Sequence, residues 1–162
     1  MDNDLPLDKK RTFLCVIDGS PEVKQAIYYT SRRAKKTGAA IMLLGIVPKV
    51  TGGSEMMWGD VKNQLEKQNN SDTQKSCDFY RDYISEHTHI DVKYILKQGR
   101  ATDVIKETLK EHPEIRILVL GTGLGENPGP IIKELTSGTT KLNIPITLVP
   151  GDMSEDEIDL LS

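Results

Sequence analysis

The sequence predicts an α/β fold, a five-stranded doubly wound parallel sheet with helices on both faces. Five segments of strand length, most of them nearly unbroken apolar runs, alternate with segments of helical spacing. The strands are expected at residues 13–17, 41–47, 89–96, 117–120 and 144–149. Continuous apolar runs indicate strands buried on both faces, and helices between them produce right-handed parallel crossovers. Ligands in such folds bind at the carboxyl ends of the strands.

The first strand runs directly into Asp18-Gly19-Ser20-Pro21, a cluster of turn and helix-start residues. Ser20 is expected to cap the next helix, and Pro21 suits its first position. Apolar or small side chains then recur at helical spacing, basic residues fill the last turns, and Gly38 ends the helix. The pattern predicts a strand–turn–helix unit at the start of the sheet.

The middle of the chain is predicted from less regular patterns. Residues 48–59 contain a proline and glycines and have no hydrophobic period, which predicts a loop. Residues 60–87 are mostly polar with a helical rhythm, and residues 69–72 are a candidate interruption of that helix. After the third strand, residues 102–111 are expected to form a short amphipathic helix. A helix over residues 130–142 then separates the last two strands.

The length of 162 residues favours one domain. We expect it to span residues 11–151, after a disordered lead-in at residues 1–10. Residues 152–162 are acidic and are expected to form a loose or loosely docked tail. The charged N-terminus lacks the apolar segment of a secretory signal, so a cytoplasmic location is expected.

Several function classes find no support in the composition. A formal net charge of −3 gives no basic field for nucleic acid, and no apolar run is long enough to span a membrane. Two cysteines are too few for a disulfide scaffold. His87, His89 and His112 do not have metal-ligand spacing. Because no nucleophile–base or carboxylate pair stands out either, no enzymatic activity and no metal are expected.

A glycine-rich loop follows the fourth strand, with glycines at Gly121, Gly123, Gly125 and Gly129. Glycine lets backbone amides approach an anion, and the N-terminus of the next helix adds a favourable dipole, so a nucleotide phosphate is one interpretation. A bare tight turn is the other. The spacing does not match the dinucleotide fingerprint, which would have a glycine where Glu126 stands, and no Walker lysine follows.

Three fragments resemble the universal stress protein family. They are FLCVIDGSPEVKQAI, KQGRATDVIKETLKEHPEIRILVLGTG and NIPITLVPG, which occur in the family's order within residues 11–151. The resemblance implies an adenine nucleotide alpha-hydrolase-like fold that binds ATP or AMP. Adenine would lie near Ile46, the ribose at Asp18 and the phosphates on the glycine motif. The implied binding residues are Asp18, Ile46, Leu120, Gly121, Gly125, Gly138, Thr139 and Thr140.

The glycine motif departs from the family pattern in its middle. Family members that bind ATP carry Gly-x-x-Gly followed nine residues later by Gly-Ser/Thr. Leu124 and Pro128 stand where the second glycine is expected, counted from Gly121 and from Gly138. Pro128 and Pro130 also remove two amide donors. The phosphate site is therefore reshaped, restricted to a shorter nucleotide, or lost. Asp18 likewise has two interpretations, a ribose ligand or a turn residue.

The resemblance implies a sensor or adaptor role in the stress response for an unknown client protein, and a homodimer formed through the final strand. An apolar strand at the edge of a sheet also favours pairing with a second copy on physical grounds. The alternative is a family member that binds no nucleotide and acts only as a protein-interaction module. The altered glycine motif favours that alternative.

Overall fold

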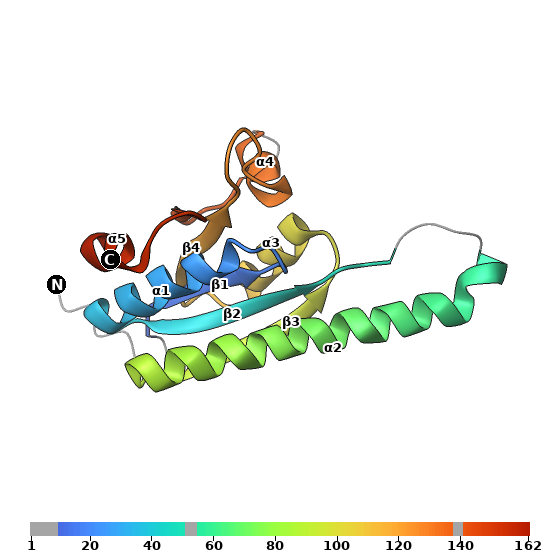
Figure 1. Cartoon of the computed structure of the whole chain (residues 1–162), viewed down its shortest axis with the longest axis horizontal. Coiled ribbons are helices and arrows are strands. Elements are labelled where there is room, and N and C mark those ends of the chain that lie inside the picture. The colour runs from blue at the N-terminus through green and yellow to red at the C-terminus, as the bar shows by residue number, and fades with distance from the viewer. Residues whose placement is uncertain (1–9, 51–54, 138–140) are drawn as a thin grey trace.

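Five parallel strands form one sheet in the order β3-β2-β1-β4-β5, as the computed structural model shows (Figure 1). The structure describes residues 10–50, 55–137 and 141–162. The strands are β1 (Thr12–Ile17), β2 (Ala40–Val47), β3 (Val92–Gln98), β4 (Ile115–Thr122) and β5 (Ile146–Pro150). The chain winds outward from β1 to β3 and then returns to the other side of β1 for β4. The predicted doubly wound parallel sheet is thus confirmed.

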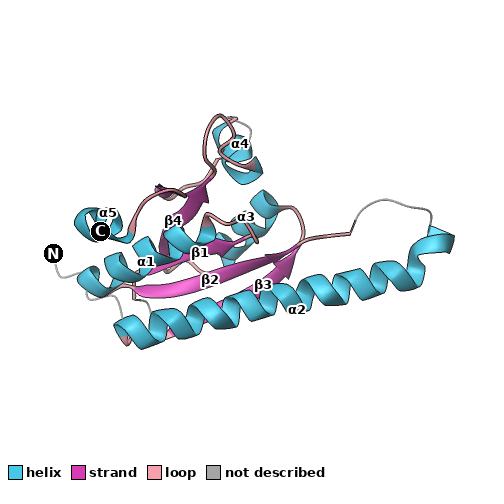
Figure 2. Ribbon diagram, in the orientation of Figure 1, coloured by secondary structure: helices cyan, strands magenta, loops and turns pink. Residues whose placement is uncertain are grey.

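Helices cover both faces of this sheet (Figure 2). They are α1 (Val23–Thr37), α2 (Glu55–Thr88), α3 (Ala101–Glu111), α4 (Pro130–Thr136) and α5 (Glu155–Leu161). Cys15 of β1 lies in one buried cluster with Ile27 of α1 and Ile84 of α2. Its neighbour Leu14 lies in a second cluster, to which α3 and α4 contribute Ile105 and Ile131. Successive strand residues face opposite sides, so the apolar runs are buried from both sides, as predicted.

Helix α1 begins later than the sequence predicted. Its first residue is Val23, so Pro21 lies in the preceding turn and Ser20 does not cap the helix. Instead, the backbone N–H of Ser20 donates a hydrogen bond to Oδ1 of Asp18, at 3.0 Å. A short aspartate turn of this kind competes with a helix start for the same residue types. The predicted end at Gly38 is confirmed, because Gly38 is the C-cap and has a left-handed φ of 72°.

Helix α2 is longer than predicted and passes beyond the sheet (Figure 1). It begins at Glu55, so the predicted loop over residues 48–59 is wrong in its second half. The candidate interruption at residues 69–72 lies inside the continuous helix. There Gln68 Nε2 donates to Asp72 Oδ1 at 2.8 Å, one helical turn away. Such contacts between neighbouring turns hold polar residues in a helix that their turn propensity would otherwise interrupt.

Smaller boundaries also differ from the prediction, for example at α4, β5 and β3. Helix α4 ends at Thr136 rather than running through residues 130–142, and the described residues from 141 to 145 are not helical. Strand β5 begins at Ile146. Strand β3 begins at Val92, because His89 adopts a positive φ of 57° that breaks an extended strand.

The acidic tail at residues 152–162 contains helix α5, where a loose or loosely docked end was expected. Ser154 begins it with a capping box. The Ser154 hydroxyl accepts a bond from the Glu157 amide, and the Glu157 carboxylate accepts one from the Ser154 amide. Ile158 is completely buried. Local capping and one apolar anchor together explain why this short segment is ordered.

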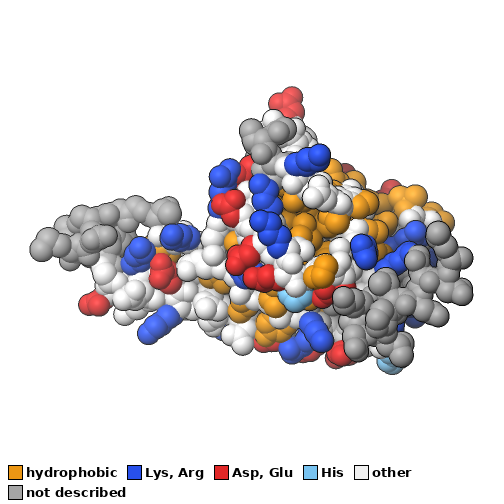
Figure 3. Space-filling view, turned by 180° about the vertical axis from the view of Figure 1, so that it is seen from behind, with side chains coloured by type: hydrophobic (Ala, Val, Ile, Leu, Met, Phe, Trp, Pro, Cys, Tyr) orange, Lys and Arg blue, Asp and Glu red, His pale blue; other side chains and the backbone are white. Residues whose placement is uncertain are grey.

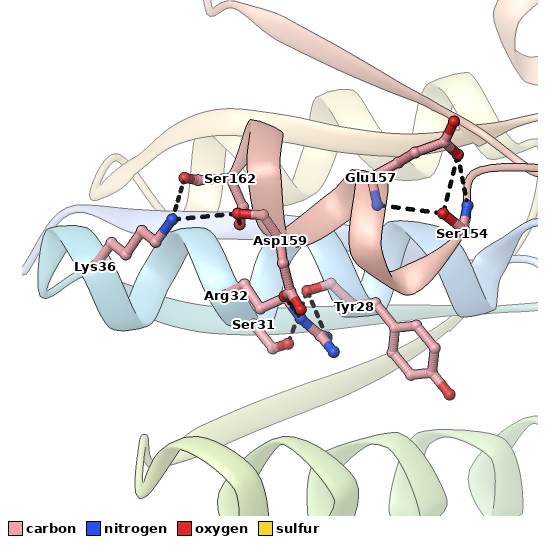
Figure 4. A network of polar contacts seen from close by, with 8 residues as sticks. All are labelled: Tyr28, Ser31, Arg32, Lys36, Ser154, Glu157, Asp159 and Ser162. Carbon is pink, nitrogen blue, oxygen red and sulfur yellow. Dashed lines mark hydrogen bonds and ion pairs between the residues drawn. The ribbon is translucent and has the colours of Figure 1, made fainter.

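Basic residues on α1 hold α5 in place (Figure 4). Arg32 forms an ion pair with Asp159. Lys36 donates through Nζ to the backbone oxygen of Ser162 at 2.8 Å. The acidic composition of the tail is thus matched by cations in the last turns of α1, and α5 becomes part of the layer that α1 and α2 form.

Candidate functional site

A cavity of about 300 Å³ opens at the carboxyl ends of β1 and β4. These two neighbouring strands leave the sheet with crossovers in opposite directions, which makes this edge its topological switch point. The segment after β1 contributes Asp18, Ser20, Pro21 and Glu22, and the segment from β4 to α4 contributes most of the rest. The lining is completed by Val16, Val23, Leu120, Gly121, Gly123, Asn127, Pro128, Gly129, Pro130, Ile131 and Ile132.

Gly121 lies where β4 comes close to the turn after β1. A Cβ atom at this position would stand 2.5 Å from the backbone oxygen of Glu22. Gly151, just after β5, is similarly close to the Glu22 side chain, at 2.5 Å. At Gly121 the neighbour is backbone, so the turn after β1 can pack this closely against β4 only if residue 121 is glycine, whereas at Gly151 the flexible Glu22 side chain can move aside. This packing explains Gly121 without any ligand.

The glycine-rich loop uses some of its amides internally. The Gly123 N–H donates to the Pro128 carbonyl at 3.2 Å, and the Gly129 N–H donates to Oδ1 of Asn127 at 3.3 Å. Pro128 and Pro130 have no N–H. A ligand therefore finds fewer donors in this loop than its four glycines suggest.

The ionisable groups that line the cavity are acidic. They are Asp18 and Glu22, and no lysine or arginine contributes to the described lining. At the same edge, Arg100 before α3 is in an ion pair with Glu134 of α4 and does not line the cavity. A polyphosphate would enter without a neutralising cation, whereas a carboxylate such as Asp18 can accept hydrogen bonds from hydroxyl groups.

The structure brings together three of the predicted site residues. Asp18, Leu120 and Gly121 line the same cavity. Ile46 is 8% exposed in β2 and packs in the core cluster with α3 and α4, outside the cavity lining. Gly125 is exposed in the loop with a φ of 76°, and it does not line the cavity either. The predicted phosphate ligands Gly138, Thr139 and Thr140 lie outside the described residues.

Sequence reasoning did not select Pro21, Glu22 or Asn127, which also line the cavity. Glu22 was a natural choice for the first turn of a helix, and its backbone contact with Gly121 depends on how β1 and β4 pair. No local pattern reports such a contact. Asn127 next to a proline did carry a turn signal, and its side chain does accept a bond within the loop.

The two cysteine thiols are buried and shielded from solvent. Cys15 and Cys77 are both free and buried. Burial raises the pKa of each thiol to about 12, so neither is a thiolate at neutral pH. Across the described ranges, no group of three histidine, cysteine or acidic side chains could hold a metal ion. Among the described helices, none combines the length and apolar character needed to cross a membrane.

Solved structures share this fold, although no protein-family model and no curated protein matches the sequence. Universal stress protein UspA from Lactobacillus plantarum matches with a TM-score of 0.73 and 16% identity, over 87% of this chain and 98% of that one. An Arabidopsis thaliana universal stress protein family protein with AMP bound matches with a TM-score of 0.56 and 16% identity, over 86% and 90%. The Archaeoglobus fulgidus universal stress protein in complex with dAMP gives 0.55 and 13%, over 86% and 97%.

These matches confirm at the level of fold the resemblance that the three fragments indicated. They cover most of this chain and nearly all of each matched chain, so the whole α/β architecture is shared. Because the identities are low, only the arrangement of strands and helices can be inferred for this chain from these structures.

Proposed function

We propose that this chain is a universal stress protein that binds an adenine nucleotide in the cavity between β1 and β4 and acts as a sensor or adaptor without catalysing a reaction. The observation that carries the proposal is the cavity itself. It lies at the switch point of the sheet and is lined by Asp18, Leu120 and Gly121. The AMP and dAMP named for two structures of the same fold support this ligand class.

The ligand is AMP in preference to ATP. Asp18 and Glu22 are the ionisable groups of the described lining, and the amides of Gly123 and Gly129 are already used in the loop. Both features oppose a chain of phosphates more than a single one. Asp18 accepts hydrogen bonds from the ribose hydroxyls while it also holds the turn to Ser20.

Calorimetric titration with AMP, ATP and adenosine tests the proposal. AMP is expected to saturate one site per chain with a lower Kd than ATP. Ser20→Tyr places a ring in the cavity and is expected to weaken AMP binding by about tenfold or more, which corresponds to about 1.4 kcal/mol. Glu86→Tyr adds the same ring on exposed α2 and is the matched control. Equal AMP affinity in both variants would place the nucleotide elsewhere.

Asp18→Asn separates the two roles of Asp18. Asparagine keeps an oxygen for the Ser20 N–H, so the melting temperature should stay close to that of the wild type. The loss of the carboxylate should weaken AMP binding about tenfold, since a hydrogen bond to a charged group contributes about 1.5–3 kcal/mol. If AMP affinity is unchanged, Asp18 is a turn residue alone.

The second candidate function is a protein-interaction module that binds no nucleotide. The internal bonds of the glycine-rich loop favour it, as does Leu124, which is 60% exposed at the loop's tip. The absence of any saturable heat with AMP or adenosine would select this function. A homodimer through β5 belongs to both proposals, and so does an unknown client protein.

A further inference from the structure

A second cavity, of about 690 Å³, lies at the opposite end of the strands, their amino ends. Three arginines converge in it. Arg11 is the residue before β1, Arg33 lies in the last turns of α1, and Arg116 lies at the start of β4. Phe13 and Ile117 form its apolar floor. These arginines lie far apart in the sequence, and the fold brings them together at the amino ends of β1 and β4.

The three arginines differ from the other three in the chain. Arg32, Arg81 and Arg100 each form an ion pair with a carboxylate. None of the three in the cavity is paired with a carboxylate of the described residues, and all three side chains are exposed. The chain has a net charge of −3, so acidic partners are not scarce. The helix dipole accounts for a cation at Arg33, but it does not explain Arg11 or Arg116.

A bulge in β4 brings Ile117 to the same face as Arg116, at this cavity. Thr12 pairs with Ile115 and Phe13 with Ile117, so Arg116 is an extra residue in the β4 ladder. Ile115 packs on the α3 side of the sheet, while Ile117 packs on the α1 side. Without the bulge, residues two apart would face the same side. The extra residue therefore places Ile117 on the α1 face, where Arg33 also lies, and bulges commonly re-aim side chains at functional sites.

Lysines next to the arginine cavity extend its positive charge. A neighbouring cavity shares Gly38 and Ala39 with this one and is lined by the cations Lys10, Lys35 and Lys93, together with His89. Its acidic side chains are Asp91 and Glu114, and Glu114 is already in contact with His112. The surface at the amino ends of the strands (the amino edge) is thus basic. The cavity at their carboxyl ends (the carboxyl edge) is acidic.

We propose that the arginine cavity is a second ligand site, which binds a small anion with at least two phosphate groups. Guanidinium groups bind phosphate oxygens through paired N–H donors, and three of them match a ligand with several such oxygens. The volume suits a small molecule, and the floor of Phe13 and Ile117 can contact an apolar or ring portion. The proposal is independent of the nucleotide at the carboxyl edge.

Isothermal titration with inorganic pyrophosphate at fixed ionic strength tests the site. One saturable site per chain is expected. Arg33→Gln and Arg116→Gln should each weaken binding about tenfold or more. Both side chains are exposed, so melting temperatures should stay near that of the wild type. Arg116→Lys keeps the charge but loses the paired donors, and an intermediate affinity is expected.

Two controls make the outcome decisive. Lys62→Gln removes one positive charge from exposed α2 and should leave the affinity unchanged. Ser20→Tyr blocks the carboxyl-edge cavity and should also leave pyrophosphate binding unchanged. The proposal is overturned if pyrophosphate does not bind, if the arginine variants bind as the wild type does, or if Lys62→Gln weakens binding equally. Binding of single-stranded DNA without pyrophosphate binding would also overturn it, in favour of a macromolecular polyanion.

Discussion

Gly121 shows how one residue can satisfy a ligand motif and a packing requirement at once. The sequence places it at the first position of a phosphate-binding pattern. The structure shows the Glu22 backbone oxygen 2.5 Å from where its Cβ would lie. Asp18 has the same double character, because it holds a turn through the Ser20 N–H and also lines the cavity. At such positions, the loss of binding in a variant does not by itself identify a ligand contact.

We therefore expect Gly121→Ala to destabilise the protein even without nucleotide. The added methyl group must push the turn after β1 away from β4, and overpacking of this kind costs about 1–3 kcal/mol. Urea denaturation of the ligand-free protein measures the effect. Gly151→Ala meets the flexible side chain of Glu22 at 2.5 Å, so it should cost less. A wild-type midpoint for Gly121→Ala would show that the turn adapts freely.

At the scale of elements, α2 and α5 were harder to predict than the strands. Both are rich in polar residues, so their hydrophobic period is faint. These two helices are stabilised by contacts that the hydrophobic period does not report. Within α2, side chains one turn apart bond to one another, and α5 combines its own capping box with a buried Ile158 and cations from α1. Strands of continuous apolar residues carry their signal in composition alone.

The docking of α5 predicts a measurable contribution to stability. Ile158→Ala should lower the free energy of unfolding by about 2–5 kcal/mol, because it leaves a cavity at a completely buried position. Leu160→Ala, at a side chain that is 84% exposed, is the matched control and should change little. Urea denaturation followed by circular dichroism would compare the two. Equal midpoints would mean that α5 leaves α1 readily and does not belong to the cooperative core.

At the scale of the whole molecule, the strand order makes β3 and β5 the two outer strands of the sheet. Of these, β5 has apolar side chains that are exposed. Val149 is buried toward α1, but Ile146 and Leu148, on the other face of the strand, are 38% and 45% exposed. Figure 3, which views the molecule from behind, shows hydrophobic side chains gathered on that face beside α4. α4 is short and leaves this part of the sheet uncovered. Exposed apolar strands at an edge favour pairing with a second copy.

The dimer proposal predicts that charge on β5 separates the subunits. Ile146→Lys with Leu148→Lys should convert a dimer to a monomer, since each lysine would be desolvated in the interface. Sedimentation velocity at several concentrations would measure the change. Leu124→Lys alters a leucine in the glycine-rich loop that is 60% exposed, and it should have no effect on assembly. A dimer that persists in the double variant would place the interface on another surface.

The sequence by itself determined the parallel α/β fold, the edge of the sheet where Asp18 and Gly121 lie, and the departure of the glycine motif at Leu124 and Pro128. These conclusions depend on apolar period and turn chemistry, which are local properties of the chain. Only the tertiary structure decided that Gly121 contacts Glu22, that Ile46 lies outside the cavity, and that three distant arginines converge at the other edge. Contacts between segments far apart in sequence follow from strand order and register, and neither is encoded in a local pattern.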